Sequence, residues 1–207
     1  MPTVPPVSEP PSESGMATDE LLVNLPKTIA LVGLMGVGKT TIGRRIAEHF
    51  KLPFIDADEE IEKAAGQSIA DIFANYGEQG FRDGEQRVIC RLLDETPRIL
   101  ATGGGALTSA ITRQRLKQKA ITIWLKTDIK VLAKRVANRS HRPLLKDRHP
   151  LDVLKEHVKT RYPLYEMADI TVDTGDQSHV KSLNLVLQAL QDHLRQTTPV
   201  RPDTQND

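Results

Sequence analysis

The sequence has one cysteine, few aromatic residues, almost no net charge and no long apolar run. Cys90 alone cannot form an internal disulfide, and a zinc or iron–sulfur site needs clustered ligands. Aromatic residues at 4% and a formal charge of +1 provide neither stacking platforms nor a basic surface for nucleic acid. A membrane span requires ~20 apolar residues in a row, and no run approaches that length. We therefore expect a cytoplasmic protein that binds neither nucleic acid nor membranes.

Proline, serine and acidic residues separate a central domain from two tails. Residues 1–25 are rich in Pro and Ser and contain acidic but no basic residues, which predicts a disordered tail rather than a secretory or organelle signal. Residues 197–207 are polar and contain Pro199 and Pro202, and we expect a second disordered tail there. The length of 207 residues leaves one domain of ordinary size, which we place at 26–196.

Short β-rich runs alternate with helical patterns along this domain. The runs are apolar without strict alternation, which is typical of strands buried on both faces, and they cover 28–32, 53–56, 99–102, 121–125 and 170–172. Ser68 and Asp128 stand where helices usually start. Apolar residues repeat at helical spacing in three sets: Ile42, Ile46 and Phe50; Ile129, Leu132 and Val136; Val180, Leu183, Leu187, Leu190 and Leu194. The alternation predicts an α/β fold with a parallel sheet covered on both faces.

The strongest local signal is the segment from Gly33 to Thr40, GLMGVGKT, which has the spacing of a phosphate-binding loop between a strand and a helix. Its glycines let backbone N–H groups point at phosphate oxygens, where the helix dipole favours negative charge. Lys39 can then contact the outer phosphates of a triphosphate, and the Thr40 hydroxyl can ligate Mg²⁺. The alternative is a glycine-rich helix start without a ligand. The residues predicted to hold the nucleotide in this segment are Gly36, Val37, Gly38, Lys39, Thr40 and Thr41.

Two carboxylates follow the second predicted strand in the segment FIDAD. Asp56 and Asp58 are two residues apart, so on a strand they would face the same way. Near a magnesium triphosphate, one could organise the metal and the other could accept a proton from an alcohol. The alternative is that these residues only cap the next helix.

A run of three glycines in ATGGGA ends the third predicted strand, where an acidic residue that helps to hold magnesium is absent. The metal-supporting role therefore moves to Asp56. Consecutive glycines indicate either close approach of the backbone to another group or a plain flexible turn. Arg82, Arg142 and Arg161 could pair with phosphate or carboxylate, although a single arginine is more often a surface residue. His141, His149 and His157 lack zinc-ligand spacing and are interpreted as surface residues.

Taken in order, GLMGVGKTT, FIDAD, SIADIFANYGEQGFR, ATGGGAL, RPLL and RYPLYEMAD closely resemble the shikimate kinase family. The resemblance runs from about residue 27 to residue 194 and covers the whole predicted domain. It implies a P-loop, nucleoside monophosphate kinase-like fold with a five-stranded parallel sheet between helices and a mobile lid. It also implies transfer of the γ-phosphoryl group of ATP to the 3-hydroxyl of shikimate, with Mg²⁺ as cofactor. We expect a monomer.

Further site residues follow from this resemblance alone. It implies that Asp58 contacts the shikimate hydroxyls and that Arg82 and Arg161 hold the shikimate carboxylate. Two guanidinium groups in one pocket would repel each other without an anion between them, so we expect both to need that carboxylate. The remaining implied contacts are a backbone contact from Gly104, contact of Arg142 with the ATP phosphates, and contacts of Arg135 and Gln177 near adenine. Lys39, Asp58 and Arg142 are thus the expected catalytic residues.

Two alternatives stay open at this point. Another small-molecule P-loop kinase, such as gluconate kinase, would share the phosphate loop but not the FIDAD, GFR, GGGA and RYPLY set. A non-catalytic nucleotide-binding protein could use the same fold, because a fold does not dictate a function. In such a protein we would expect loss of Lys39, Asp58, Arg82, Arg142 or Arg161, and all five are present. The segment 139–151 has prolines and charges without an apolar face, which favours a lid that opens easily.

Overall fold

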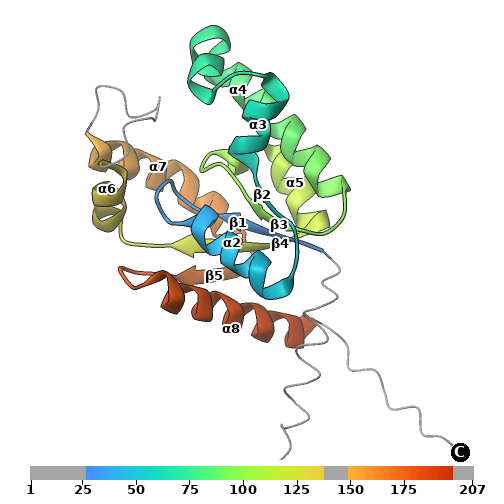
Figure 1. The fold of residues 1–207 in the computed structure, drawn as a ribbon. Helices are drawn as coiled ribbons and strands as arrows, with labels where there is room; N and C mark the ends of the chain where they lie inside the picture. The colour runs from blue at the N-terminus through green and yellow to red at the C-terminus, as the bar shows by residue number, and fades with distance from the viewer. Residues whose placement is uncertain (1–26, 138–148, 198–207) are drawn as a thin grey trace, which may run out of the picture.

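The computed structural model describes residues 27–137 and 149–197, which fold around one five-stranded sheet (Figure 1). All strand pairs are parallel, and the strand order is β2-β3-β1-β4-β5. The strands are β1 Thr28–Val32, β2 Phe54–Asp56, β3 Ile99–Ala101, β4 Ala120–Lys126 and β5 Ile170–Asp173. The predicted five-stranded parallel sheet is confirmed, with each strand within two residues of its expected bounds.

Helices cover both faces of this sheet. Figure 1 shows α2 and α8 together on one side and α5 and α7 on the other, while α3 and the first half of α4 project away from the sheet. The described helices are α2 Lys39–Phe50, α3 Ala57–Ala65, α4 Ile69–Asp94, the 3₁₀ turn η1 Ala106–Thr108, α5 Ala110–Lys119, α6 Ile129–Ala137, α7 Pro150–Tyr165 and α8 His179–Thr197. Within this part of the chain, no helix is both long and apolar enough to cross a membrane.

Helix α4 begins as predicted and then changes direction. The Ser68 hydroxyl caps its first turn by accepting from the backbone N–H of Asp71 at 3.1 Å. Inside the helix Gly77 has φ 68° and ψ −175°, a positive φ that favours glycine. The break separates the projecting first half from a second half that carries Phe81 and Arg82. Asp128 also starts a helix as predicted, since its carboxylate accepts from the N–H of Lys130 at 2.7 Å.

The core lies between the sheet and its helices. Every residue of β1 is buried, and the predicted face of Ile42, Ile46 and Phe50 on α2 packs against the sheet. On α8 the buried row is Ser182, Val186, Leu190 and Leu194, whereas Leu183 and Leu187 are partly buried. Val180, the first residue of the predicted repeat, lies in the first turn of α8 and is 56% exposed.

An aromatic cluster joins β4 to α7. Trp124 is buried in β4, and its ring centroid lies 5.0 Å from that of Tyr162 and 5.8 Å from that of Tyr165. Tyr165 is itself fully buried and ends α7. These contacts fix the last turn of α7 against the sheet, close to the carboxyl ends of the strands where ligands bind in open α/β folds.

Candidate active site

The loop between β1 and α2 has the geometry of a phosphate-binding loop. Gly38 caps α2 with a φ of 99°, so the chain enters the helix through a conformation that side chains rarely adopt. The Lys39 ammonium donates to the carbonyls of Gly33 at 2.8 Å and Leu34 at 3.0 Å. These bonds hold the lysine across the loop, at the positive end of the α2 dipole. The strand–loop–helix context predicted for this segment is confirmed.

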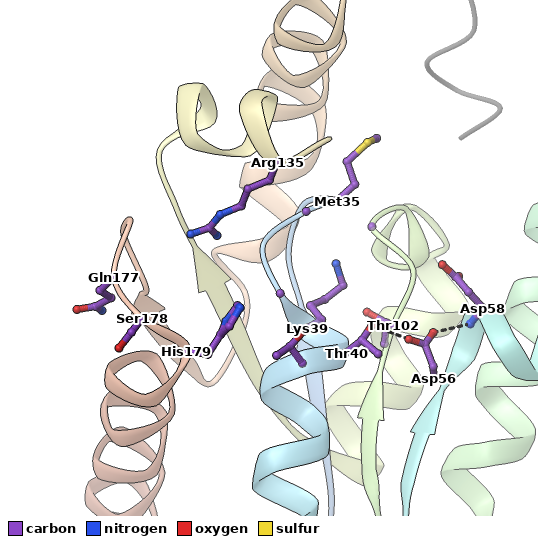
Figure 2. A pocket seen from close by; sticks show the side chains of 14 residues that line it. Met35, Lys39, Thr40, Asp56, Asp58, Thr102, Arg135, Gln177, Ser178 and His179 are labelled. Carbon is purple, nitrogen blue, oxygen red and sulfur yellow. Dashed lines mark hydrogen bonds between the residues drawn. The ribbon is translucent and has the colours of Figure 1, made fainter. Parts of the chain in front are cut away.

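A cavity of about 540 Å³ opens in front of this loop (Figure 2). Seven residues predicted to bind the nucleotide line it, namely Gly36, Gly38, Lys39, Thr40, Thr41, Arg135 and Gln177. Val37, also predicted to bind the nucleotide, is buried and is not among the residues that line the cavity, so its contact stays a prediction. Residues that we did not predict there include Met35, Thr102, Ser178 and His179. Ser178 and His179 follow Gln177 at the start of α8, so their place after a strand end could have indicated them.

Asp56 joins the phosphate loop to the next helix. Its Oδ2 accepts from the Thr40 hydroxyl at 2.7 Å, and its Oδ1 accepts from the backbone N–H of Asp58 at 3.0 Å (Figure 2). Asp56 is therefore the N-cap of α3, as in the capping alternative, and it also presents an oxygen next to Thr40. The capping bond leaves Asp58 in the first turn of α3, where its side chain borders the cavity.

A second cavity of about 370 Å³ lies beside the first and shares Met35, Asp58 and Gly104 with it. It brings together residues far apart in the sequence, because β2–α3, α4, the loop after β3 and α7 each supply a wall. All four residues expected to contact shikimate line it: Asp58, Arg82, Gly104 and Arg161. Its other walls are largely apolar and include Ile69, Phe73 and Phe81. The geometry thus places two cavities on either side of the Asp58 carboxylate.

Two of the three glycines after β3 lie close to charged side chains of α4. A Cβ at position 105 would lie 2.3 Å from Nη1 of Arg82, and one at position 103 would lie 2.4 Å from Oε1 of Glu85. The alternative of a plain flexible turn is therefore wrong at these positions. The carbonyl of Gly104 accepts a hydrogen bond from the Tyr165 hydroxyl, which ties the loop to α7.

Arg82 already has counter-ions in the protein. Its guanidinium lies 2.7 Å from Glu85 and 3.1 Å from Glu78, and Glu85 is almost completely buried. Burial opposes the charge of Arg82, but the two carboxylates, Glu85 above all, raise its pKa overall. Burial raises the pKa of Glu85, whose second oxygen, Oε1, is buried without a hydrogen-bond partner among the described residues. We did not predict Glu85, although its spacing of three residues from Arg82 on a helix indicates an ion pair.

Arg161 differs from Arg82 in its direct partners. It is 7% exposed and makes no ion pair with residues 27–137 or 149–197. Burial, and then the charge of Arg82, lower the pKa of Arg161, and this lowering outweighs the opposite effects of Tyr165 and Glu78. The expectation that both arginines need an external anion is therefore wrong for Arg82, which has Glu85 and Glu78 as counter-ions, and for Arg161 it stays a prediction.

The remaining predicted residues are the histidines, Arg135 and Arg142. His149 is exposed, as predicted, but the surface interpretation of His157 is wrong, because it is half-buried with Nε2 3.0 Å from Nη2 of Arg161. Arg135 lies 3.5 Å from both the Gly175 carbonyl and Asp176, at the rim of the first cavity. Arg142 and His141 lie outside the described residues, as does most of the predicted lid.

Comparisons with known proteins agree on one family. The shikimate kinase family model matches residues 35–191. A shikimate kinase from Caulobacter vibrioides is 51% identical over 175 residues, which cover 84% of this chain and 88% of that protein. A shikimate kinase from Bradyrhizobium diazoefficiens is 47% identical over 184 residues, covering 89% of each chain.

Solved structures give the same result. Shikimate kinase from Acinetobacter baumannii, solved in complex with shikimate, has a TM-score of 0.79 and 38% identity, and the match covers 87% of this chain and 99% of that chain. A gluconokinase from Sinorhizobium meliloti reaches a TM-score of 0.56 at 22% identity, covering 84% of this chain and 98% of that one. The second likeness extends only to the fold.

Proposed function

The chain belongs to the shikimate kinase family, and from this premise we propose that it transfers the γ-phosphoryl group of ATP to the 3-hydroxyl of shikimate. The products would be shikimate 3-phosphate and ADP, on the route to aromatic amino acids. The observation that carries the proposal is the meeting of two cavities at Asp58 and Gly104. One cavity has a phosphate loop, and the other has the buried guanidinium of Arg161, which forms no ion pair with the described residues. A kinase for an anionic alcohol needs both.

Phosphoryl transfer depends mainly on positioning and on stabilising charge at the phosphoryl oxygens. The loop glycines Gly36 and Gly38 and the start of α2 offer backbone N–H groups to the triphosphate. Lys39 supplies positive charge at the same place, and Thr41 completes the cavity wall. Arg135 and Gln177, at the far side of this cavity, are proposed to contact the adenine end of ATP. We assign Arg142 to the ATP phosphates on the family resemblance alone.

Asp58 is proposed as the general base. Because its side chain lines both cavities, its carboxylate lies where the acceptor hydroxyl would approach the γ-phosphate. It can hydrogen-bond the 3-hydroxyl, orient it, and take its proton as the oxygen attacks phosphorus. Gly104 lines both cavities too, and its backbone is proposed to contact the acceptor beside the reacting group.

Mg²⁺ fits the oxygen donors at the head of α2. The Thr40 hydroxyl and the Asp56 carboxylate are hard oxygen ligands, 2.7 Å apart and next to Lys39. Magnesium usually takes one or two protein oxygens together with substrate phosphates and water. Thr40 would bind the ion directly, and Asp56 would orient Thr40 or a coordinated water. When bound, Mg²⁺ neutralises negative charge on the phosphates.

Thr40→Val should raise the magnesium concentration needed for half-maximal activity by at least about tenfold, because it removes an oxygen ligand and the hydrogen bond that Asp56 Oδ2 accepts. Steady-state rates over a magnesium titration at fixed ATP measure this shift. Thr160→Val, on the exposed side of α7, is the matched control and should leave the titration unchanged. An unaltered magnesium dependence in Thr40→Val would remove Thr40 from the metal site.

The acceptor carboxylate is proposed to bind Arg161, with Arg82 as a second, already neutralised contact. Removing one partner of a desolvated charge pair typically costs ~2–5 kcal/mol. Arg161→Ala, or a shikimate analogue with a hydroxymethyl group in place of the carboxylate, should therefore each weaken acceptor binding by more than about tenfold. Calorimetric titration measures both losses.

The two losses should not add, because both remove the same interaction. Arg161→Ala titrated with the neutral analogue should lose much less than the sum of the separate effects. Fully additive losses would show that Arg161 does not hold the carboxylate. Arg82→Ala should give a smaller coupling with the analogue, because Glu85 and Glu78 already compensate its charge.

The proposed reaction is tested by an ADP-release assay with shikimate, gluconate and nucleoside monophosphates as alternative acceptors. Shikimate should give the fastest turnover, and Arg161 and Asp58 variants should reduce it. Faster turnover with gluconate would favour the other small-molecule kinase. Absence of turnover with every acceptor, together with tight ATP binding, would favour a non-catalytic nucleotide-binding protein.

We further propose that the protein acts as a monomer in the cytoplasm. The described residues of one chain supply walls to both cavities, so a second subunit is not needed to complete them. The single cysteine suits a reducing compartment. Sedimentation equilibrium measures the oligomeric state. The division into a domain at 26–196 and tails at 1–25 and 197–207 remains a prediction.

A further inference from the structure

The guanidinium of Arg161 is held by a histidine one helical turn earlier on α7. Nη2 of Arg161 lies 3.0 Å from Nε2 of His157. A guanidinium only donates hydrogen bonds, so the imidazole Nε2 must accept, and the ring hydrogen must reside on Nδ1. That Nδ1 is buried and has no hydrogen-bond partner among the described residues. His157 is therefore the Nδ1–H tautomer, and its ring makes one hydrogen bond among the described residues, which Nε2 accepts from Arg161.

This arrangement contrasts with that of Arg82, which lines the same second cavity, called the acceptor cavity from here on. Glu85 and Glu78 fix the Arg82 guanidinium but also cancel its charge. A neutral imidazole fixes a guanidinium without adding negative charge. The same cavity therefore contains one arginine in direct ion pairs with two carboxylates and one arginine whose guanidinium hydrogen-bonds a neutral imidazole.

The surroundings of His157 favour its neutral form. Burial, and then the charge of Arg161, lower the pKa of His157 to about 4. The other charged groups acting on the ring are Glu156 on its own helix and Arg82 and Glu78 on α4. Because the pKa is lowered, the ring stays neutral and able to accept throughout the pH range of ordinary kinase assays.

We propose that His157 is a positioning residue that orients the Arg161 guanidinium through Nε2 and leaves its positive charge for the acceptor carboxylate. The inference rests on the proposed function, in which Arg161 holds the carboxylate of shikimate. It assigns a role to a side chain that sequence patterns placed on the surface. Acceptor affinity then depends on hydrogen-bond acceptance at position 157 and on the absence of negative charge there.

Three variants at position 157 separate these requirements, with shikimate KM and kcat measured at saturating ATP. His157→Leu keeps apolar bulk without an acceptor and should raise the KM by about tenfold, the usual effect of losing a hydrogen bond to a charged group, with kcat within about twofold. His157→Gln places an amide oxygen near the position of Nε2 and should restore the KM to within about threefold of wild type. His157→Glu accepts but adds charge, so its KM should exceed that of His157→Leu.

The control and the double variant complete the design. His49→Leu changes an exposed histidine on α2 and should leave both constants unchanged. In an Arg161→Ala background, His157→Leu should add less than about twofold to the KM, because the two residues act as one unit.

Equal KM increases in the Leu and Gln variants, or none in either, would overturn the role of His157 even if Arg161→Ala raises the KM. A lower KM in His157→Glu than in His157→Leu would also overturn it, since charge at this position would then assist binding. If Arg161→Ala leaves the KM unchanged, the proposed carboxylate contact fails, and the inference about His157 falls with it. The single Arg161 variant therefore distinguishes the two failures.

Discussion

Lys39→Ala is expected to lower turnover at saturating ATP by at least about 100-fold, the effect of removing one preorganised group from the charge developing in a transition state. The ammonium lies at the N-terminus of α2 and is held across the phosphate loop by the carbonyls of Gly33 and Leu34. Alanine removes this cation while keeping helix propensity high. ATP affinity should fall as well. ADP release under saturating shikimate measures turnover, and calorimetry with ATP measures binding.

A matched control separates this effect from a general loss of positive charge. Lys63 on α3 has a side chain that is 79% exposed, and it pairs with Glu60 on the surface. Lys63→Ala should leave turnover and ATP binding close to wild type, because exposed ion pairs contribute little. Near-normal turnover in Lys39→Ala at saturating ATP would remove the phosphate-loop assignment.

Asp58→Asn is expected to lower kcat by ~100-fold or more, the usual contribution of a general base. The amide keeps the size and shape of the side chain but cannot accept the proton of the 3-hydroxyl. The backbone N–H of Asp58, which Asp56 accepts, is unchanged by the substitution, so the start of α3 should persist. Shikimate affinity should change much less than kcat, and calorimetric titration checks this.

Glu59→Gln is the matched control, since it removes a carboxylate from the next residue of the same helix. Glu59 is exposed and pairs with Arg44 at 3.0 Å, away from both cavities. The kcat of the Glu59→Gln variant should stay within about twofold of wild type. A decrease of less than about fivefold in Asp58→Asn would withdraw the base role and leave Asp58 with orientation of the acceptor only.

The sheet could be predicted from sequence because strands buried on both faces carry a strong signal. The β1 run from Thr28 to Val32 is apolar and ends in a glycine loop, so both its bounds are marked. Capping residues marked helix starts equally well, as at Ser68 and Asp128. Local chemistry determines these features, and local chemistry is what a sequence displays.

The charges of the acceptor cavity could not be predicted in the same way. Whether an arginine lacks a counter-ion depends on which carboxylates the fold brings near it. Glu85 reaches Arg82 from the same helix, whereas no carboxylate in the described part of the chain pairs with Arg161. The half-buried state of His157 depends likewise on how α7 packs near α4. Tertiary packing decides such features, and a single sequence does not show it.

Trp124 gives the protein a built-in optical reporter. It is the chain's single tryptophan, it is buried, and its ring contacts Tyr162 and Tyr165 at the end of α7. Tyr165 in turn donates to the carbonyl of Gly104, which borders both cavities. Indole emission therefore senses how α7 sits against the glycine loop. Acceptor binding can be followed by fluorescence without an attached label, including in Asp58→Asn protein whose slow chemistry leaves no rate to measure.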